Sequence, residues 1–281
     1  KVYGEDGGQL SVSYTNEVIK EINNLEDIAS INIIEKDEAI EKGLLLYVGK
    51  EIDDVYIDSL KTLSINPELI EKVSDSFKIV YTPLHGTGNK PVRRVLSEIG
   101  FKNVLVVKEQ ELPDADFSTV KYPNPEDKAS FEIAIELAKK EDVDLIIGTD
   151  PDADRLGVVV KNNEGDYIML SGNQVGCLFM EYILSQKKKK GGIPPNGFVI
   201  KTIVSTELAR KIAQSYEVEM VEVLTGFKFI GEQIKLLDEM GDKKYLFGFE
   251  ESYGYLMGTF ARDKDAVVAS MFIGEMAAYY K

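Results

Sequence analysis

Three aspartates occupy alternate positions in one short stretch of the sequence, Asp150, Asp152 and Asp154, and Arg155 follows them directly. At an effective dielectric near 20, unit charges roughly 4 Å apart repel by about 4 kcal/mol, so this crowding is unfavourable without a cation. Carboxylate oxygens suit a hard ion such as Mg²⁺. The spacing therefore predicts a magnesium site. Arg155 could orient the carboxylates or hold a phosphate with two hydrogen bonds.

Two other interpretations of this acidic stretch compete with a magnesium site. A calcium-binding EF-hand loop also begins Asp-x-Asp-x-Asp, but it requires Gly at loop position 6 and Glu at position 12. Those positions hold Arg155 and Lys161 here, which excludes an EF-hand. A solvated acidic turn without any ion remains the plain structural alternative.

A second polar loop, Glu250-Glu251-Ser252, follows the apolar run at 245–249. A carboxylate accepts hydrogen bonds from neighbouring sugar hydroxyls, and a serine can both donate and accept. Glu250 and Ser252 are therefore candidates for binding a polyhydroxylated ligand. A solvated turn with a helix-capping serine is the structural alternative.

Two further stretches could contact an anion. Thr225 and Gly226 precede a predicted helix, whose N-terminal amides could bind a phosphate. An ordinary N-cap by Thr225 is the alternative. Lys264 lies in the charged stretch 261–265, before the closing helix, and could contact a phosphate or act as an acid. Solvated charges are the alternative there.

The glycine-rich stretch 83–90 has neither the phosphate-loop spacing nor the dinucleotide-binding spacing, so a structural turn is the preferred interpretation. It contains His85, the only histidine of the chain. A histidine-based metal centre, or a catalytic triad that uses another histidine, is therefore excluded.

These loops fall between regularly alternating helices and strands. The first set of predicted elements comprises strands at 77–81, 103–107 and 144–148 and helices at about 53–64, 90–99 and 126–141. The second comprises strands at 198–204, 220–224 and 245–249 and helices at about 173–186, 206–216 and 228–240. Continuous apolar strands that alternate with helices indicate parallel strands covered on both faces. We predict an α/β fold with two consecutive three-layer α/β/α domains, each containing a mostly parallel mixed sheet.

The acidic loop at 150–154 and the loop at 250–252 each follow the third strand of their set. In open α/β sheets, ligands bind beyond the carboxyl ends of the strands. Residues 1–48 are different: they contain a polar helix at about 15–29 and only short apolar runs, too few for a core of their own. Because the chain opens with Lys1 in a loop-like segment, we expect a fragment whose preceding domain is largely missing.

Composition limits the classes of partner. The formal charge of −15 disfavours nucleic acid and anionic membranes as partners, since both are negatively charged. The single cysteine, Cys177, allows no disulfide within one chain, which favours a reducing, cytoplasmic location. No run of residues reaches the length of about 18 apolar residues that a membrane span requires.

Taken together, four motifs resemble those of the α-D-phosphohexomutase superfamily. Asp150–Arg155 is similar to its metal loop and Glu250–Ser252 to its sugar-binding loop, and 225–228 and 262–265 are similar to two further active-site loops. The match covers nearly the whole chain in the expected order. The forms Thr-Gly-Phe-Lys and Phe-Glu-Glu-Ser-Tyr-Gly-Tyr are closer to phosphoglucomutases and phosphopentomutases than to bifunctional phosphomannomutases.

The resemblance implies part of a magnesium-dependent enzyme that interconverts hexose 1-phosphate and hexose 6-phosphate, with glucose as the expected sugar. A phosphoserine would donate phosphate to the sugar, and a hexose 1,6-bisphosphate would be the intermediate. The resemblance assigns Mg²⁺ to Asp150, Asp152 and Asp154, and substrate binding to Arg155, Thr225, Gly226, Glu250, Ser252 and Lys264.

The resemblance also implies a four-domain enzyme, of which this chain would hold a first-domain remnant (1–48), the second domain (49–165) and the third domain (166–281). The phosphoserine loop is expected upstream of Lys1 and the fourth domain beyond the C-terminus, so no catalytic residue is expected here and the chain alone should be inactive. Two other classes remain open: a non-catalytic sugar-phosphate-binding module, and a magnesium-dependent phosphatase of the Asp-x-Asp type. Preference for mannose or pentose phosphate also remains open.

Overall fold

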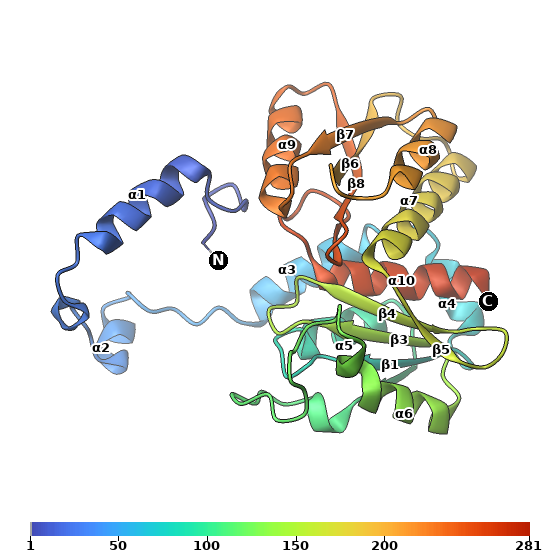
Figure 1. Ribbon diagram of the computed structural model, residues 1–281, viewed down its shortest axis with the longest axis horizontal. Coiled ribbons are helices and arrows are strands. Elements are labelled where there is room, and N and C mark those ends of the chain that lie inside the picture. Colours follow the sequence, from blue (N-terminus) through green and yellow to red (C-terminus); the bar gives the residue numbers. More distant parts are fainter. Residues whose placement is uncertain (1) are drawn as a thin grey trace.

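The computed structural model describes residues 2–281, which form two α/β units and an N-terminal arm (Figure 1). Each unit contains one sheet with helices packed against it, as the sequence predicted. Two consecutive α/β units with mixed sheets confirm the predicted fold class, although only the second sheet is mostly parallel, since the first has two parallel and two antiparallel pairings. Within residues 2–281, no helix combines the length and the apolar character needed to cross a membrane.

The first unit is built on a five-stranded sheet with the order β2-β1-β3-β4-β5. Its strands are β1 (Lys78–Thr82), β2 (Asn103–Val106), β3 (Leu145–Thr149), β4 (Leu156–Lys161) and β5 (Tyr167–Leu170). The central strand β1 runs parallel to β2 and β3, whereas β4 and β5 form an antiparallel extension. Every residue of β3 is buried, as expected for a strand covered on both faces.

The helices of the first unit begin and end close to the predicted positions. They are α3 (Lys50–Lys61), α4 (Pro67–Val73), α5 (Asn89–Glu98) and α6 (Glu132–Glu141), with short 3-10 turns η2 (Lys108–Gln110) and η3 (Lys128–Phe131). The helix predicted over 126–141 begins only at Glu132, because η3 forms the turn before it. Helix α4 was not predicted from the sequence.

The second unit repeats the central arrangement of the first. Its four-stranded sheet has the order β7-β6-β8-β9, in which β6 runs parallel to both neighbours and β9 is antiparallel. The strands are β6 (Gly197–Thr202), β7 (Glu219–Val223), β8 (Lys244–Glu250) and β9 (Gly254–Leu256). The helices are α7 (Gly172–Lys189), α8 (Glu207–Ser215), α9 (Phe227–Glu239) and α10 (Ala266–Tyr280).

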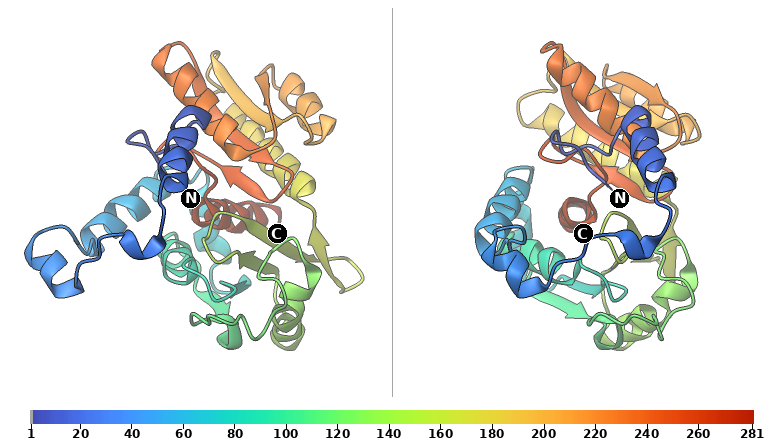
Figure 2. Two further views of the ribbon diagram at one scale, coloured as in Figure 1. Left: turned by 60° about the vertical axis from the view of Figure 1, so that its left-hand side comes forward. Right: turned by 90° about the vertical axis from the view of Figure 1, so that its left-hand side faces the viewer.

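Helix α10 connects the two units, an arrangement that was not predicted. Helix α10 follows the second unit in sequence, yet it packs against α5 and α4 of the first unit and lies between the two sheets (Figures 1 and 2). Strand β5 pairs with β4 in the first sheet, although the predicted third domain begins at residue 166. Buried residues of both units consequently form one continuous apolar cluster. Each unit also contains a smaller apolar cluster of its own.

Most of the N-terminal arm projects away from the two units (Figure 1), whereas its first residues contact the second unit. It contains α1 (Val12–Asn23), η1 (Ile28–Ser30) and α2 (Lys36–Glu41), so the predicted helix at 15–29 begins and ends earlier than expected. Within 2–48, only Gly8 and Ala39 are buried. This segment therefore has no core of its own in the described structure.

Candidate active site

Three loops meet where the two units join: the acidic loop after β3, the Glu250–Ser252 loop after β8, and the 261–265 loop before α10. Backbone hydrogen bonds of 3.0 Å join them in pairs. The Leu156 amide donates to the Tyr253 carbonyl, and the Ala266 amide donates to the Ala153 carbonyl. Because these bonds are backbone-to-backbone, they fix how the loops lie relative to one another.

The structure brings the three aspartates of the acidic loop together. Each of Asp150, Asp152 and Asp154 offers a carboxylate oxygen, and these oxygens lie within 4.8 Å of one another. Asp150 and Asp154 are buried, whereas Asp152 is exposed. An all-oxygen set of this kind suits Mg²⁺, so the residues present fit the ion that the sequence predicted.

The acidic loop is held in shape by its first aspartate. Asp150 Oδ1 accepts hydrogen bonds from the backbone amides of Asp154 (3.0 Å) and Arg155 (2.9 Å), which closes the loop. Burial raises the pKa of the Asp150 carboxyl to about 6, and the Asp152 charge adds to this, while the hydrogen bond from the Arg155 amide opposes it. Burial therefore disfavours the charged form of Asp150, and a cation beside it would favour that form.

Two basic side chains lie against the acidic loop. Lys264 Nζ donates to Asp154 Oδ2 at 2.8 Å, and both side chains are nearly inaccessible, at 7% and 10% exposed. Arg155 Nε lies 4.0 Å from Asp150 and 3.9 Å from Asp154. Its Nη1 donates to Glu126 at 2.6 Å. Lys264 and Arg155, both predicted site residues, therefore surround the acidic cluster.

The glycine-rich loop packs against the acidic loop at Pro151. The amide and hydroxyl of Thr87 both donate to the Pro151 carbonyl, at 2.9 and 3.1 Å. A Cβ on Gly86 would lie 2.4 Å from Pro151 Cα, so only glycine allows this approach. His85 is buried, with its ring nitrogens bonded to Leu112 O and Thr119 Oγ1. The stretch is therefore a structural turn that packs against the acidic loop.

Glu250 lies close to Lys264. It is only 5% exposed. A Cβ on Gly254 would lie 2.5 Å from Lys264 Cδ and 2.8 Å from Glu250 Oε1, so these two side chains both lie against Gly254. Burial raises the pKa of Glu250, and the Lys264 charge and the Ser252 hydroxyl oppose that rise. Lys264 thus links the two carboxylate loops.

A cavity of about 470 Å³ opens in front of the acidic loop and Lys264. Tyr3 and Tyr56 also line it, and neither was predicted from the sequence. Tyr56, on α3, donates to Asp265 Oδ2 at 2.7 Å, and Asp265 caps α10. Asp265 lies inside a charged stretch that the sequence had marked as a candidate. Nothing local in the sequence marks Tyr56, because it reaches the site only through the packing of α3.

Of the predicted substrate residues, only Lys264 lines this cavity, whereas Arg155, Glu250 and Ser252, like Thr225 and Gly226, do not. Thr225 and Gly226 follow β7 and do not line it. Gly226, with φ of 119°, is the N-cap of α9 and provides no side-chain cap, so the alternative of capping by Thr225 is also not observed. Lys228 and Phe229, just beyond them, line a different and larger cavity of about 960 Å³.

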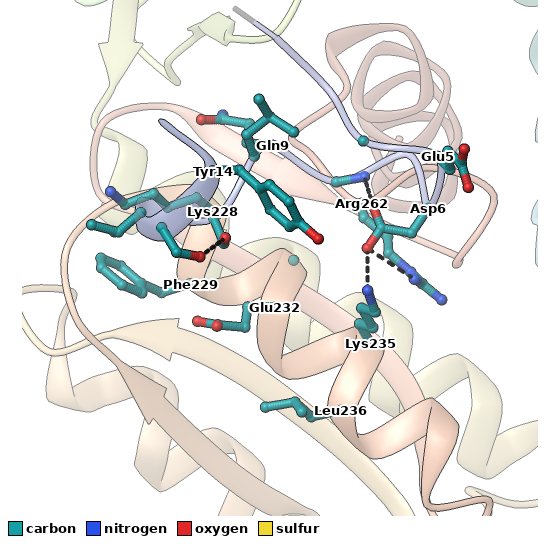
Figure 3. Close-up of a pocket in the computed structure, with 17 residues that line it drawn as sticks. Glu5, Asp6, Gln9, Tyr14, Lys228, Phe229, Glu232, Lys235, Leu236 and Arg262 are labelled. Carbon is teal, nitrogen blue, oxygen red and sulfur yellow. Dashed lines mark hydrogen bonds and ion pairs between the residues drawn. The ribbon is translucent and has the colours of Figure 1, made fainter. Parts of the chain in front are cut away.

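The larger cavity lies between α9 and an N-terminal hairpin, residues 2–10, in which Tyr3 pairs with Gln9 (Figure 3). Asp6 lies between two basic side chains there, with Lys235 Nζ at 2.6 Å and Arg262 Nη1 at 4.0 Å. Nearby, Tyr3 Oη and Gln9 Nε2 donate to Asp263 at 2.9 and 2.8 Å. The N-terminal hairpin is thereby attached to the 261–265 loop, beside Lys264.

Comparisons with known proteins agree with this geometry. Residues 54–165 match the family model for phosphoglucomutase/phosphomannomutase alpha/beta/alpha domain II, and residues 171–281 match domain III. The chain is 40% identical over 267 residues to a phosphoglucomutase from Staphylococcus haemolyticus, covering 95% of this chain and 46% of that protein. A phosphoglucomutase from Staphylococcus aureus USA300 is 39% identical, with the same coverage. The chain thus spans about half the length of these curated relatives.

Solved structures share the fold. A protein from Thermus thermophilus, described as a phosphomannomutase, has a TM-score of 0.67 at 22% identity, covering 84% of this chain and 49% of that chain. An N-acetylphosphoglucosamine mutase from Aspergillus fumigatus, solved with GlcNAc-6P and magnesium, has a TM-score of 0.51 at 13% identity, covering 78% and 50%. Because both family models match in order and together cover most of the chain, it belongs to the phosphoglucomutase/phosphomannomutase family.

Proposed function

We propose that this chain is part of a magnesium-dependent phosphohexomutase that interconverts hexose 1-phosphate and hexose 6-phosphate, with glucose as the sugar. One observation carries the proposal: Lys264 lies between the acidic metal loop and the Glu250 loop, so a metal site and a hydroxyl-binding site adjoin. The relatives at about 40% identity are named phosphoglucomutases, which supports glucose over mannose or pentose phosphate.

In this proposal Asp150, Asp152 and Asp154 hold Mg²⁺. The ion would offset the negative charge that develops when a phosphoryl group is transferred. Lys264 would add a positive charge at the same cavity and so help to hold a phosphate. Arg155 would orient Asp150 and Asp154, since its Nε lies 4.0 and 3.9 Å from their oxygens.

Glu250 and Ser252 would bind the hydroxyls of the sugar ring. Glu250 is buried and lies beside Lys264, so it can accept hydrogen bonds in a site with little competing water. Thr225 and Gly226 would contribute through a part of the substrate site away from the 470 Å³ cavity, whose lining does not include them.

Among residues 2–281, those that line this cavity include no serine. We therefore propose that the phosphoserine belongs to a part of the full-length protein outside this chain, as the resemblance implied. A hexose 1,6-bisphosphate would be the intermediate, and first and fourth domains would complete the site. The buried, free Cys177 supports a reducing, cytoplasmic location for the enzyme.

The test is a coupled assay on the full-length protein. Purified enzyme with Mg²⁺, glucose 1-phosphate and catalytic glucose 1,6-bisphosphate should form glucose 6-phosphate, detected with glucose 6-phosphate dehydrogenase. Release of inorganic phosphate without isomerisation would instead indicate a phosphatase. Substrate binding with neither reaction would indicate a non-catalytic binding module.

A further inference from the structure

The middle residue of the sugar-binding loop points away from the proposed substrate. Glu251 Oε2 accepts hydrogen bonds from Thr202 Oγ1 at 2.8 Å and Ser205 Oγ at 3.2 Å, both at the end of β6. Its neighbour Glu250 lies beside Lys264 instead. We propose that Glu251 is a positioning residue, which anchors the loop so that Glu250 and Ser252 face the sugar. This inference rests on the proposed mutase function.

The anchor point for Glu251 is itself rigid. Beneath it lies Lys201, whose side chain is fully buried. Lys201 Nζ donates to the Ser205 carbonyl at 3.1 Å and forms ion pairs with Glu222 at 2.6 Å and Glu207 at 2.9 Å. A buried ammonium with several partners resists displacement, because moving any partner would leave its charge uncompensated. The turn after β6 is therefore a fixed support.

The backbone of the sugar-binding loop packs closely against the start of α7. A Cβ on Gly172 would lie only 2.0 Å from the Glu251 carbonyl oxygen, so the first turn of α7 packs directly onto the loop. Tyr255 Oη also donates to the Gly172 carbonyl at 3.3 Å. The loop is thus enclosed between α7 and the end of β6, and the Glu251 side chain attaches it to the β6 side.

Loss of the Glu251 carboxylate should loosen the loop without unfolding the domain. The two hydroxyls that donate to it, on Thr202 and Ser205, lie 2.8 Å apart, so without the carboxylate one of them can donate to the other. The hydrogen bonds that close the metal loop, from the amides of Asp154 and Arg155 to Asp150, do not involve Glu251. Replacing Glu251 should therefore lower kcat/KM for the sugar phosphate, while the affinity for Mg²⁺ is retained.

The experiment uses the full-length protein in the coupled mutase assay. Glu251→Ala should lower kcat/KM for glucose 1-phosphate by about tenfold, the effect of losing a hydrogen-bonded anchor. Glu251→Gln should recover most of this loss, because its amide oxygen can accept from the same hydroxyls. Mg²⁺ affinity and Tm should stay near the wild-type values in both variants.

Glu181→Ala is the matched control. Glu181 is also half-buried in the second unit and also accepts a hydrogen bond from a hydroxyl, that of Tyr216 at 2.6 Å, but it lies on α7 and its partner follows α8, so neither residue belongs to the loops that form the site. The kcat/KM of the Glu181→Ala variant should be unchanged.

A double-mutant cycle supplies a second readout. Thr202→Val should lower kcat/KM in the wild-type protein but have little further effect in the Glu251→Ala variant.

Each outcome separates this inference from the proposed function. A wild-type protein without mutase activity would overturn the proposed function, and this inference with it. An active wild type with unimpaired Glu251→Ala would overturn only the positioning role. Parallel loss of Mg²⁺ affinity and Tm in Glu251→Ala, without recovery in Glu251→Gln, would also overturn it, since that pattern indicates general destabilisation.

Discussion

The three aspartates of the acidic loop, the proposed metal ligands, have different surroundings. Asp150 is buried and accepts hydrogen bonds from two backbone amides. Asp154 is buried and accepts a hydrogen bond from Lys264. Asp152 is exposed and lines the cavity. The two buried residues therefore also shape the protein around the site. Asp152 is the aspartate whose replacement should disturb the fold least, which makes it the clearest test of metal binding.

Asp152→Asn should weaken Mg²⁺ binding. Replacing partners of metal ligands typically costs 10–100-fold in affinity, so removing the charge of a ligand itself should cost at least about tenfold. Isothermal calorimetry on the 281-residue chain measures this directly. Asp116→Asn, a change at another exposed aspartate, is the control and should bind normally. Equal affinity in Asp152→Asn and wild type would mean that this loop is not the metal site.

Glu250→Ala should impair sugar recognition and leave the metal unaffected. A hydrogen bond to a charged acceptor is worth roughly 1.5–3 kcal/mol, which corresponds to about one to two decades in kcat/KM. The measurement is steady-state kinetics of the full-length enzyme with glucose 1-phosphate, together with Mg²⁺ titration of the same protein. A loss smaller than twofold would remove Glu250 from the substrate site.

At the scale of elements, the site depends on loops that hold one another. The Gly86 turn packs against Pro151 in the middle of the metal loop, and Thr87 donates twice to the same residue. Neither residue is a predicted ligand. Their contribution is to support the loop, in the way that outer-shell partners orient metal ligands.

Gly86→Ala should consequently reduce Mg²⁺ affinity by about tenfold, although residue 86 is no ligand. The added Cβ would lie 2.4 Å from Pro151 Cα, and because that atom is backbone, the metal loop must shift. Calorimetry is again the measurement. Gly49→Ala is the control, because its nearest neighbouring atom would be 3.5 Å away. Normal affinity in Gly86→Ala would show that the metal loop tolerates movement of its support.

Periodicity and strand-end position were sufficient to predict most elements and the proximity of Asp150, Asp152 and Asp154. The β4–β5 hairpin was missed, although the β-branched run Val158–Val160 and the turn residues 162–165 were a visible signal for it. Helix α4 was missed because it has only seven residues, despite Pro67 in its first turn. Tyr56 could not be predicted, since its position depends on long-range packing alone.

At the scale of the whole molecule, α10 makes the two units mutually dependent. Its Glu275 is 1% exposed and accepts from the Ser64 hydroxyl, from the amides of Ile65 (3.0 Å) and Asn66 (3.1 Å), and from Tyr182 Oη (2.8 Å). The first three donors lie in the first unit and Tyr182 lies on α7 of the second. One buried carboxylate therefore joins both units to α10.

Glu275→Ala should lower the free energy of unfolding by about 3 kcal/mol or more, because several buried donors lose their acceptor at once. Since the apolar cluster is continuous across the units, the wild type should unfold in a single transition, and this transition should shift in the variant. Denaturant unfolding followed by circular dichroism and tyrosine fluorescence measures both. Two separate transitions in the wild type would contradict the shared core.

The 281-residue chain alone should have no mutase activity, even with added glucose 1,6-bisphosphate. The reaction needs a phosphate donor at the metal. Of the serines near the site, Ser205 is bonded to Thr202 and Glu251 behind the sugar-binding loop, and Ser252 lies in that loop; neither lines the 470 Å³ cavity. The aspartates of the cavity would be occupied by Mg²⁺.

The 281-residue chain should therefore bind the metal without catalysing the reaction. Calorimetry should detect Mg²⁺ binding to it, while its rate in the coupled assay stays at background. The full-length enzyme should convert glucose 1-phosphate under the same conditions. Circular dichroism of the 281-residue chain provides the check that it is folded. Sustained turnover by this chain, prepared free of host mutase, would show that a nucleophile lies among its own residues and that the phosphoserine has been assigned to the wrong part of the protein.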